Sequence, residues 1–250
     1  MNYLKSILGL IFLLVVQTVS ANCLSNDKCY TPLTHFYIDV GAGWVFDQQA
    51  SDYYLPRDPL PDRYVANTSK NNVMGLASLG YVWRQTQDWL PFISVGLEYS
   101  YLPSSKIQGP VEEFSSPEFT TQNYEYKVQH QNLQLTSKID IYRCGRWMPY
   151  IALGIGTSWN TSSAYQEYAL TDQPEIQPEF ANKTKTAFSY AAGLGIDFIA
   201  NDNLWLGLGY RYDNFGSNQT NNGIREFANK HLDNHMKAHT VLLSLRYLFL

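Results

Sequence analysis

Residues 36–46 alternate between bulky apolar side chains and residues that are mostly small or charged. The first set is Phe36, Ile38, Val40, Ala42, Trp44 and Phe46, and the second is Tyr37, Asp39, Gly41, Gly43 and Val45. Because successive side chains of a β-strand point to opposite faces, this pattern predicts a strand with one strongly apolar face. Such alternation is typical of strands that cross a membrane as part of a barrel.

The same alternation returns seven more times, which gives eight predicted strands. They cover residues 36–46, 77–83, 91–101, 133–141, 149–159, 188–198, 206–212 and 241–249. Their connections are alternately long and short, as in a membrane barrel with long extracellular loops and short periplasmic turns. The sequence therefore predicts an all-β fold, an eight-stranded antiparallel up-and-down transmembrane barrel. An extra hairpin within residues 103–129 would raise the number of strands to ten.

The first residues carry the pattern of a secretory signal peptide. Lys5 precedes an apolar run over residues 7–16, and Val19-Ser20-Ala21 supplies a cleavage site of small residues. The run is shorter than the roughly 20 residues that a spanning helix needs. We expect a signal peptide at 1–21, a periplasmic segment at 22–34 and the barrel, with four long extracellular loops, at 35–250. The predicted location is the outer membrane of a Gram-negative bacterium.

The net charge of the chain limits its possible binding partners, and its cysteines suggest possible covalent links. Cleavage would remove Lys5 and change the formal net charge from −4 to −5, which excludes nucleic-acid binding through a basic surface. Cys23 and Cys29 are close enough in sequence to form a disulfide in an oxidising periplasm. Lipid attachment at Cys23 is the alternative. Cys144 is expected to be a lone thiol.

The aromatic residues indicate which face of each strand meets lipid. An eight-stranded barrel has room inside for little more than its own side chains, so the bulky face is expected to point outward. On that face aromatic residues gather at both ends of the strands, as in the girdles of membrane barrels. The loop-side girdle is Trp44, Phe46, Tyr99, Tyr101, Trp159, Phe188, Tyr190, Tyr210 and Tyr212, and the turn-side girdle is Phe36, Tyr81, Trp83, Phe198, Tyr247 and Phe249.

Two segments carry a resemblance to a known family. Residues 207–212 read Gly-Leu-Gly-Tyr-Arg-Tyr, and residues 245–249 read Leu-Arg-Tyr-Leu-Phe. The chain resembles the small eight-stranded outer-membrane barrels typified by the membrane domain of outer-membrane protein A, outer-membrane protein X and the opacity-type surface proteins. The resemblance implies insertion by the barrel-assembly machinery, contact with membrane lipid and lipopolysaccharide, and no cofactor. Leu250 departs from the family, which usually ends on the aromatic residue.

Eight charged residues fall on the face that is predicted to line the lumen. They are Asp39, Arg84, Glu98, Lys138, Asp140, Asp197, Arg211 and Arg246. Buried charges must pair or reach water, and we expect the pairs Glu98–Arg211 and Asp39–Arg246. The set would then either plug the lumen or line a narrow path for water, ions or small solutes. A wide pore is excluded, because aqueous channels need sixteen or more strands.

Three histidines recur at every fourth position near the end of the chain: His231, His235 and His239. On a helix they would share one face and could bind Zn²⁺ or Cu²⁺, but the segment runs into a predicted strand, so no metal site is expected. A lipid A-modifying enzyme would need a serine and an acid near such a histidine. The residue two positions after His239 on the same face is Val241, which does not favour that activity.

These observations predict a non-enzymatic barrel whose extracellular loops serve adhesion, host or cell-surface contact, or envelope integrity. Loops commonly carry recognition, and aromatic side chains are enriched at interfaces. The predicted aromatic anchors are Tyr53, Tyr54, Tyr64, Tyr165 and Tyr168. The alternative function is a narrow channel for ions or small solutes.

Overall fold

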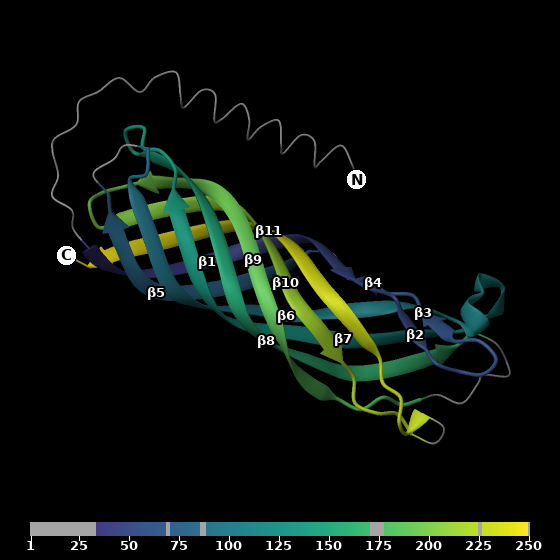
Figure 1. The fold of residues 1–250 in the computed structure, drawn as a ribbon. Helices are drawn as coiled ribbons and strands as arrows, with labels where there is room; N and C mark the ends of the chain where they lie inside the picture. Colours follow the sequence, from purple (N-terminus) through teal and green to yellow (C-terminus); the bar gives the residue numbers. More distant parts are fainter. Residues whose placement is uncertain (1–33, 69–70, 86–88, 171–177, 225–226, 250) are drawn as a thin grey trace.

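The computed structural model describes residues 34–68, 71–85, 89–170, 178–224 and 227–249. Eight long strands form an antiparallel barrel (Figure 1). They are β1 (Thr34–Ala50), β5 (Asn72–Arg84), β6 (Phe92–Glu112), β7 (Thr120–Asp140), β8 (Trp147–Ala169), β9 (Lys183–Ile199), β10 (Leu204–Gln219) and β11 (Asp233–Phe249). The ring closes because β1 pairs with both β5 and β11, and β6 pairs with β7. The predicted fold class is confirmed.

The two faces of the strands are divided as the alternation requires. Lipid-facing side chains are exposed, for example Leu153 (58%) and Leu243 (63%), whereas lumen-facing Ser94 and Asp197 are 1% exposed. Aromatic residues pack against each other at both ends of the outer face. Phe36 lies 5.6 Å from Tyr81 between ring centroids at the turn side. No helix in the described residues is long and apolar enough to cross a membrane.

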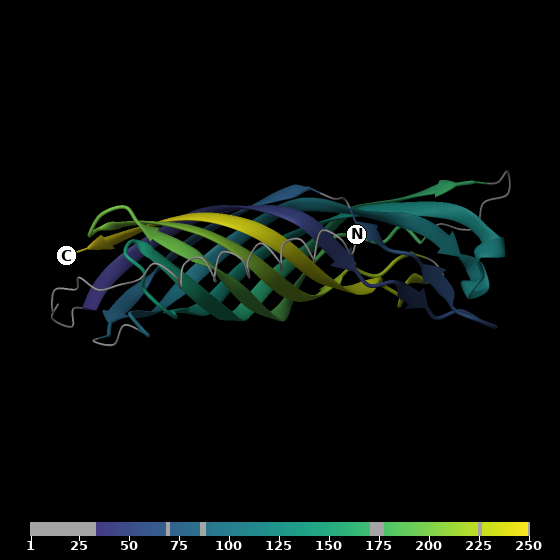
Figure 2. The same ribbon diagram turned by 90° about the horizontal axis from the view of Figure 1, so that it is seen from above.

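Several strands extend well beyond the closed ring (Figures 1 and 2). They continue past the outer aromatic girdle, which the sequence did not predict. β6 extends to Glu112, β7 begins at Thr120, and β8 extends to Ala169. Much of the polar sequence that was predicted to form loops is therefore strand. The hairpin within 103–129 prolongs β6 and β7 and adds no strand to the ring. Register shifts between Leu102 and Ser105 on β6, and between Ser163 and Gln166 on β8, change which residues of these two strands face inward.

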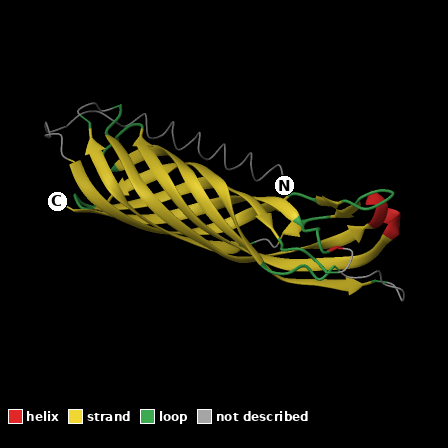
Figure 3. Ribbon diagram, turned by 60° about the horizontal axis from the view of Figure 1, so that its bottom comes forward, coloured by secondary structure: helices red, strands yellow, loops and turns green. Residues whose placement is uncertain are grey.

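Three short strands from the first long connection extend the sheet at the edge of the prolonged β6. They are β2 (Tyr53–Leu55), β3 (Asp62–Tyr64) and β4 (Asn67–Thr68). Both β3 and β4 pair with β6, whereas among the described strands β2 pairs only with β3. Two single-turn helices, η1 (Glu113–Ser115) and η2 (Pro117–Phe119), connect β6 to β7. They lie at the end of the molecule opposite to the C-terminus (Figure 3). We call the described part of the chain beyond the outer girdle the cap. It consists of the three short strands, the two single-turn helices and the prolonged ends of the long strands with their connections.

The cap has its own hydrophobic core. Its buried members include Leu55, Tyr64, Leu102, Ile107, Val111, Tyr124, Tyr126, Val128, Phe180, Phe215, Phe227, Leu232 and Met236. Burial raises the pKa of the Tyr64, Tyr124 and Tyr165 hydroxyls well above their usual range, so this core stays uncharged. The interpretation of five tyrosines as surface anchors is wrong for three of them. Tyr64 is buried, and Tyr53 and Tyr165 pack against the core.

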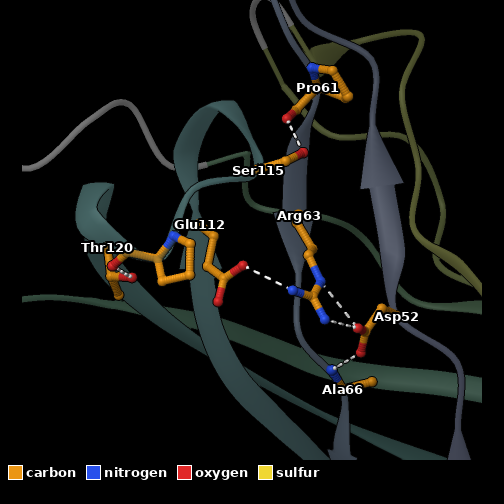
Figure 4. Close-up of polar contacts among 8 residues, drawn as sticks. Asp52, Pro61, Arg63, Ala66, Glu112, Ser115 and Thr120 are labelled. Carbon is orange, nitrogen blue, oxygen red and sulfur yellow. Dashed lines mark hydrogen bonds and ion pairs between the residues drawn. The ribbon is translucent and has the colours of Figure 1, made fainter.

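Polar contacts hold the short strands in place (Figure 4). The Arg63 guanidinium donates to Asp52 Oδ2 at 2.6 Å from Nη2 and to Glu112 Oε2 at 3.2 Å from Nη1. Asp52 Oδ1 also accepts the Ala66 backbone N–H at 2.9 Å. These bonds join β3, β6 and the segment before β2. The cap is therefore an ordered extension of the barrel wall.

Candidate functional site

The lumen contains two layers of charged side chains, which we call the upper layer (nearer the cap) and the lower layer (nearer the short turns). In the upper layer Arg211 on β10 contacts three partners. Its guanidinium donates to Glu98 Oε1 at 2.5 Å, to Asp213 Oδ1 at 2.8 Å and to Gln134 Oε1 at 3.0 Å. Arg211 is 7% exposed. One cation therefore serves two carboxylates, and the upper layer joins β6, β7 and β10 across the lumen.

The lower layer contains a second arginine and a lysine. Arg246 Nε donates to Asp39 Oδ2 at 3.1 Å, and its Nη1 donates to Ser94 Oγ at 3.1 Å. Lys138 Nζ lies 2.5 Å from Asp197 Oδ2. The Asp39–Arg246 contact joins the first and last strands of the ring, where the two residues are register partners. The structure thus brings together both charge pairs that the sequence suggested.

Two tyrosines share the lower lumen with these charges. The Arg246 guanidinium lies 4.2 Å from the centroid of the Tyr37 ring, and Lys138 Nζ lies 3.8 Å from that of Tyr150. Glycines on the facing strands make room for the rings. A methyl group at Gly96 would overlap the Tyr37 hydroxyl, and one at Gly209 would overlap the Tyr150 hydroxyl. The small lumen-facing residues are therefore the space into which the aromatic rings fit.

Both ends of the lumen are packed. A cavity of about 70 Å³ lies between the two charged layers. Below the lower layer, toward the short turns, an apolar cluster of described residues contains Tyr37, Val82, Phe92, Met148, Trp205 and Leu248. Above the upper layer, Phe215 stacks on His130 with ring centroids 4.5 Å apart, and the cap core follows. Over the described ranges packed side chains thus occupy both ends of the lumen.

The lumen differs from the sequence prediction at several residues. Arg84 lies at the turn-side rim, 5.8 Å from the Phe92 ring centroid, and belongs to neither layer. Asp213 was assigned to a loop, although it lies two residues after Arg211 on the same face of β10 and could have been included. Tyr37 and Tyr150 also have the lumen-facing parity, but only the charged residues of that face were predicted to form the site.

The three histidines do not form a metal site. His235 and His239 lie on one strand, so four residues separate them by about 13 Å. The His239 ring joins the outer girdle, with Nδ1 2.5 Å from the Tyr210 hydroxyl. His231 precedes the strand, where burial and the nearby Lys183 lower its pKa. No group of three or more His, Cys, Asp or Glu side chains in the described ranges is arranged to hold a metal ion.

Cys144 corrects the prediction of a lone thiol, because it is disulfide-bonded in the short turn between β7 and β8. The chain has three cysteines, and the other two, Cys23 and Cys29, lie outside the described residues. The predicted Cys23–Cys29 disulfide, and the alternative of lipid attachment at Cys23, therefore fall on residues that the structure does not describe. The signal peptide and the segment at 22–33 also lie outside the described residues and stay predictions.

Comparison with known proteins identifies the family. Residues 11–249 match the family described as "Outer membrane protein beta-barrel domain". The chain belongs to the outer membrane protein beta-barrel family. Membership places the barrel in the outer membrane of a Gram-negative bacterium, and it agrees with the lipid-facing girdles and the closed ring of strands.

Individual relatives are distant. An uncharacterised protein of Brucella abortus (strain 2308) is 26% identical over 164 residues, which are 60% of this chain. The match spans 56% of the relative's length. Among solved structures, OprG of Pseudomonas aeruginosa is similar with a TM-score of 0.44 and 14% identity, over 89% of this chain and 99% of OprG. Neisserial surface protein A has a TM-score of 0.42 and 12% identity, over 86% and 97% of the two chains. These values transfer no function to this chain.

Proposed function

We propose that the protein is a non-enzymatic scaffold that presents its cap for contact with another cell or molecule outside the bacterium. The observation that carries this proposal is the packing of the interior. Two charged layers, an apolar cluster and the cap core succeed one another along the barrel axis. A barrel packed in this way gives solutes no route, so its function falls to the cap.

The surface of the cap supports the same conclusion. Five large apolar side chains in the described part of the cap remain about half exposed although the cap has a core in which to bury them: Tyr54 (53%), Leu60 (53%), Phe119 (53%), Tyr168 (48%) and Leu170 (54%). Tyr54 and Tyr168 are the two predicted anchors that are exposed. Aromatic residues held on ordered strands lose little entropy when a partner binds, which is favourable for recognition.

Planar bilayers test whether the lumen is closed. We expect the refolded barrel to show no discrete conductance, with a heat-modifiability gel as the control for folding. A narrow channel is the alternative result. Openings from folded protein that change when Glu98→Gln weakens the upper layer would contradict a closed scaffold and make the lumen the functional part.

Cell binding tests the cap. A Gram-negative strain that displays the wild-type protein is expected to adhere to epithelial monolayers, and Tyr54→Ser with Phe119→Ser is expected to reduce adhesion several-fold. Trp89→Ser is the matched control, because Trp89 is also exposed (63%) but lies in the short turn before β6, at the opposite end. Equal adhesion by all three strains, with equal surface amounts, would contradict recognition by the cap and favour a role in envelope integrity.

A further inference from the structure

The lower layer has more acidic than basic groups. It contains three carboxylates, Asp39, Asp140 and Asp197, and two cations, Lys138 and Arg246. With every group in its charged form the layer would carry one net negative charge. All five side chains face the lumen, and Asp140 adjoins the apolar cluster, because its register partner Phe92 is a member of it.

Asp140 is the carboxylate that accounts for the excess negative charge of the lower layer. Asp39 is bonded to Arg246 and Asp197 lies against Lys138, so each cation already has its own acid. Asp140 is 0% exposed, and within the described chain neither of its carboxylate oxygens has a hydrogen-bond partner. Its register partners on the two neighbouring strands are Phe92 and Tyr150, both buried aromatic residues.

A charge cannot stay in such a place without compensation, because an unpaired buried ion costs several kcal/mol. The compensating charge is either a metal cation or a proton. Three or more acidic, histidine or cysteine ligands in metal-binding arrangement do not occur in the part of the chain that the structure describes. A single carboxylate between aromatic rings offers a metal ion too few ligands. A proton needs only one oxygen.

We propose that the lower layer is a proton-binding site, and that the closed barrel holds one proton on Asp140. The proton comes from solvent and forms an O–H bond on the carboxyl group, which brings the net charge of the layer to zero. Other titratable and charged groups surround Asp140 in the lower layer. They are Tyr37 and Asp39 from β1, Lys138 from β7, Tyr150 from β8, Asp197 from β9 and Arg246 from β11.

The site makes the closed state sensitive to pH in a defined direction. In the unfolded chain an aspartate is ionised at neutral pH, whereas in the closed barrel Asp140 is neutral. The folded state therefore binds one more proton than the unfolded state, and stability falls as pH rises. Where one proton is taken up on folding, each pH unit changes the folding equilibrium constant by up to about tenfold.

Infrared spectroscopy of the refolded full chain in lipid vesicles tests the proposal directly. At neutral pH the wild-type barrel is expected to show a protonated-carboxyl carbonyl band, which Asp140→Asn removes. Wild-type protein that shows no such band at neutral pH would overturn the proposal, and this reading does not depend on whether the variant folds. A band that persists in folded Asp140→Asn would overturn it equally, because the proton would then reside elsewhere.

Unfolding by urea separates this site from the other acids. Wild-type stability is expected to fall from mildly acidic to mildly alkaline pH, whereas Asp140→Asn should be nearly flat and at least as stable at the alkaline end. Asp39→Asn is the matched control, because it removes the partner of Arg246 and should destabilise the barrel at every pH. Stability that follows sodium concentration instead of pH would show that a bound metal cation supplies the charge, and would overturn the proton assignment.

Discussion

Arg211→Met is expected to destabilise the barrel by about 3–5 kcal/mol, the usual cost of breaking a buried ion pair on one side. The Arg211 side chain is 8% exposed and its partner Glu98 is 12% exposed, so solvent screens the contact little. Methionine has about the same length but leaves Glu98 and Asp213 without their cation. Equilibrium unfolding in urea from lipid vesicles, followed by tryptophan fluorescence, measures the loss.

Two further variants determine where that loss originates. Adding Glu98→Gln and Asp213→Asn to Arg211→Met removes the stranded charges, and we expect most of the lost free energy to return. Arg143→Met is the control, since Arg143 lies in a short turn and bonds only the nearby Gly145 carbonyl among the contacts resolved there. If Arg211→Met were no less stable than Arg143→Met, the upper layer would contribute nothing to holding the barrel together.

The membrane part of the fold was readable from sequence because one physical constraint acts on every residue. Lipid lies on one side of each strand and a narrow lumen on the other, so apolar and small side chains must alternate along segments such as 36–46. The same parity, together with the up-and-down order, brought Asp39 beside Arg246 and Glu98 beside Arg211. The position of each residue along its strand, and the face of the strand that it occupies, were enough to suggest ion-pair partners more than 100 positions apart in the sequence.

The cap was missed because no lipid enforces alternation there. Beyond Leu102 the outer face of β6 meets water, and a register shift places Ile107 inside although the parity of the membrane segment would point it outward. The resulting pattern reads as a polar loop. Burial of Tyr64 depends on β3 folding back on β6, which is a contact between distant segments and leaves no local signal.

The disulfide bond of Cys144 also shows what could not be predicted from the sequence. Proximity in sequence favoured a bond between Cys23 and Cys29, but spacing alone cannot determine which cysteines pair. The position of Cys144 in a short turn on the side of the chain termini was available from the predicted topology. That topology places Cys144 on the side of the oxidising periplasm, where a disulfide is more favourable than a lone thiol.

Phe215→Ala is expected to cost about 3–5 kcal/mol, as other buried Phe to Ala changes do. Phe215 is 1% exposed and stacks on His130 where the cap core meets the upper layer. Its backbone carbonyl also accepts from Ser158 Oγ at 2.5 Å and Asn160 Nδ2 at 2.8 Å, so neighbouring strands hold the backbone and limit collapse into the cavity. Urea unfolding measures the loss, and Phe215→Leu should lose much less.

Phe188→Ala separates packing inside the barrel from the loss of an aromatic ring in general. Phe188 lies on β9 on the lipid face and is 67% exposed, so its truncation creates no internal cavity and should cost clearly less than Phe215→Ala. Equal losses at the two positions would contradict a tightly packed junction between cap and lumen.

Conductance in planar bilayers then shows which packed region blocks the lumen. If Phe215→Ala alone opens the barrel, the aromatic junction is what closes it, whereas openings only after Arg211→Met is added would show that the upper layer is a second, independent barrier.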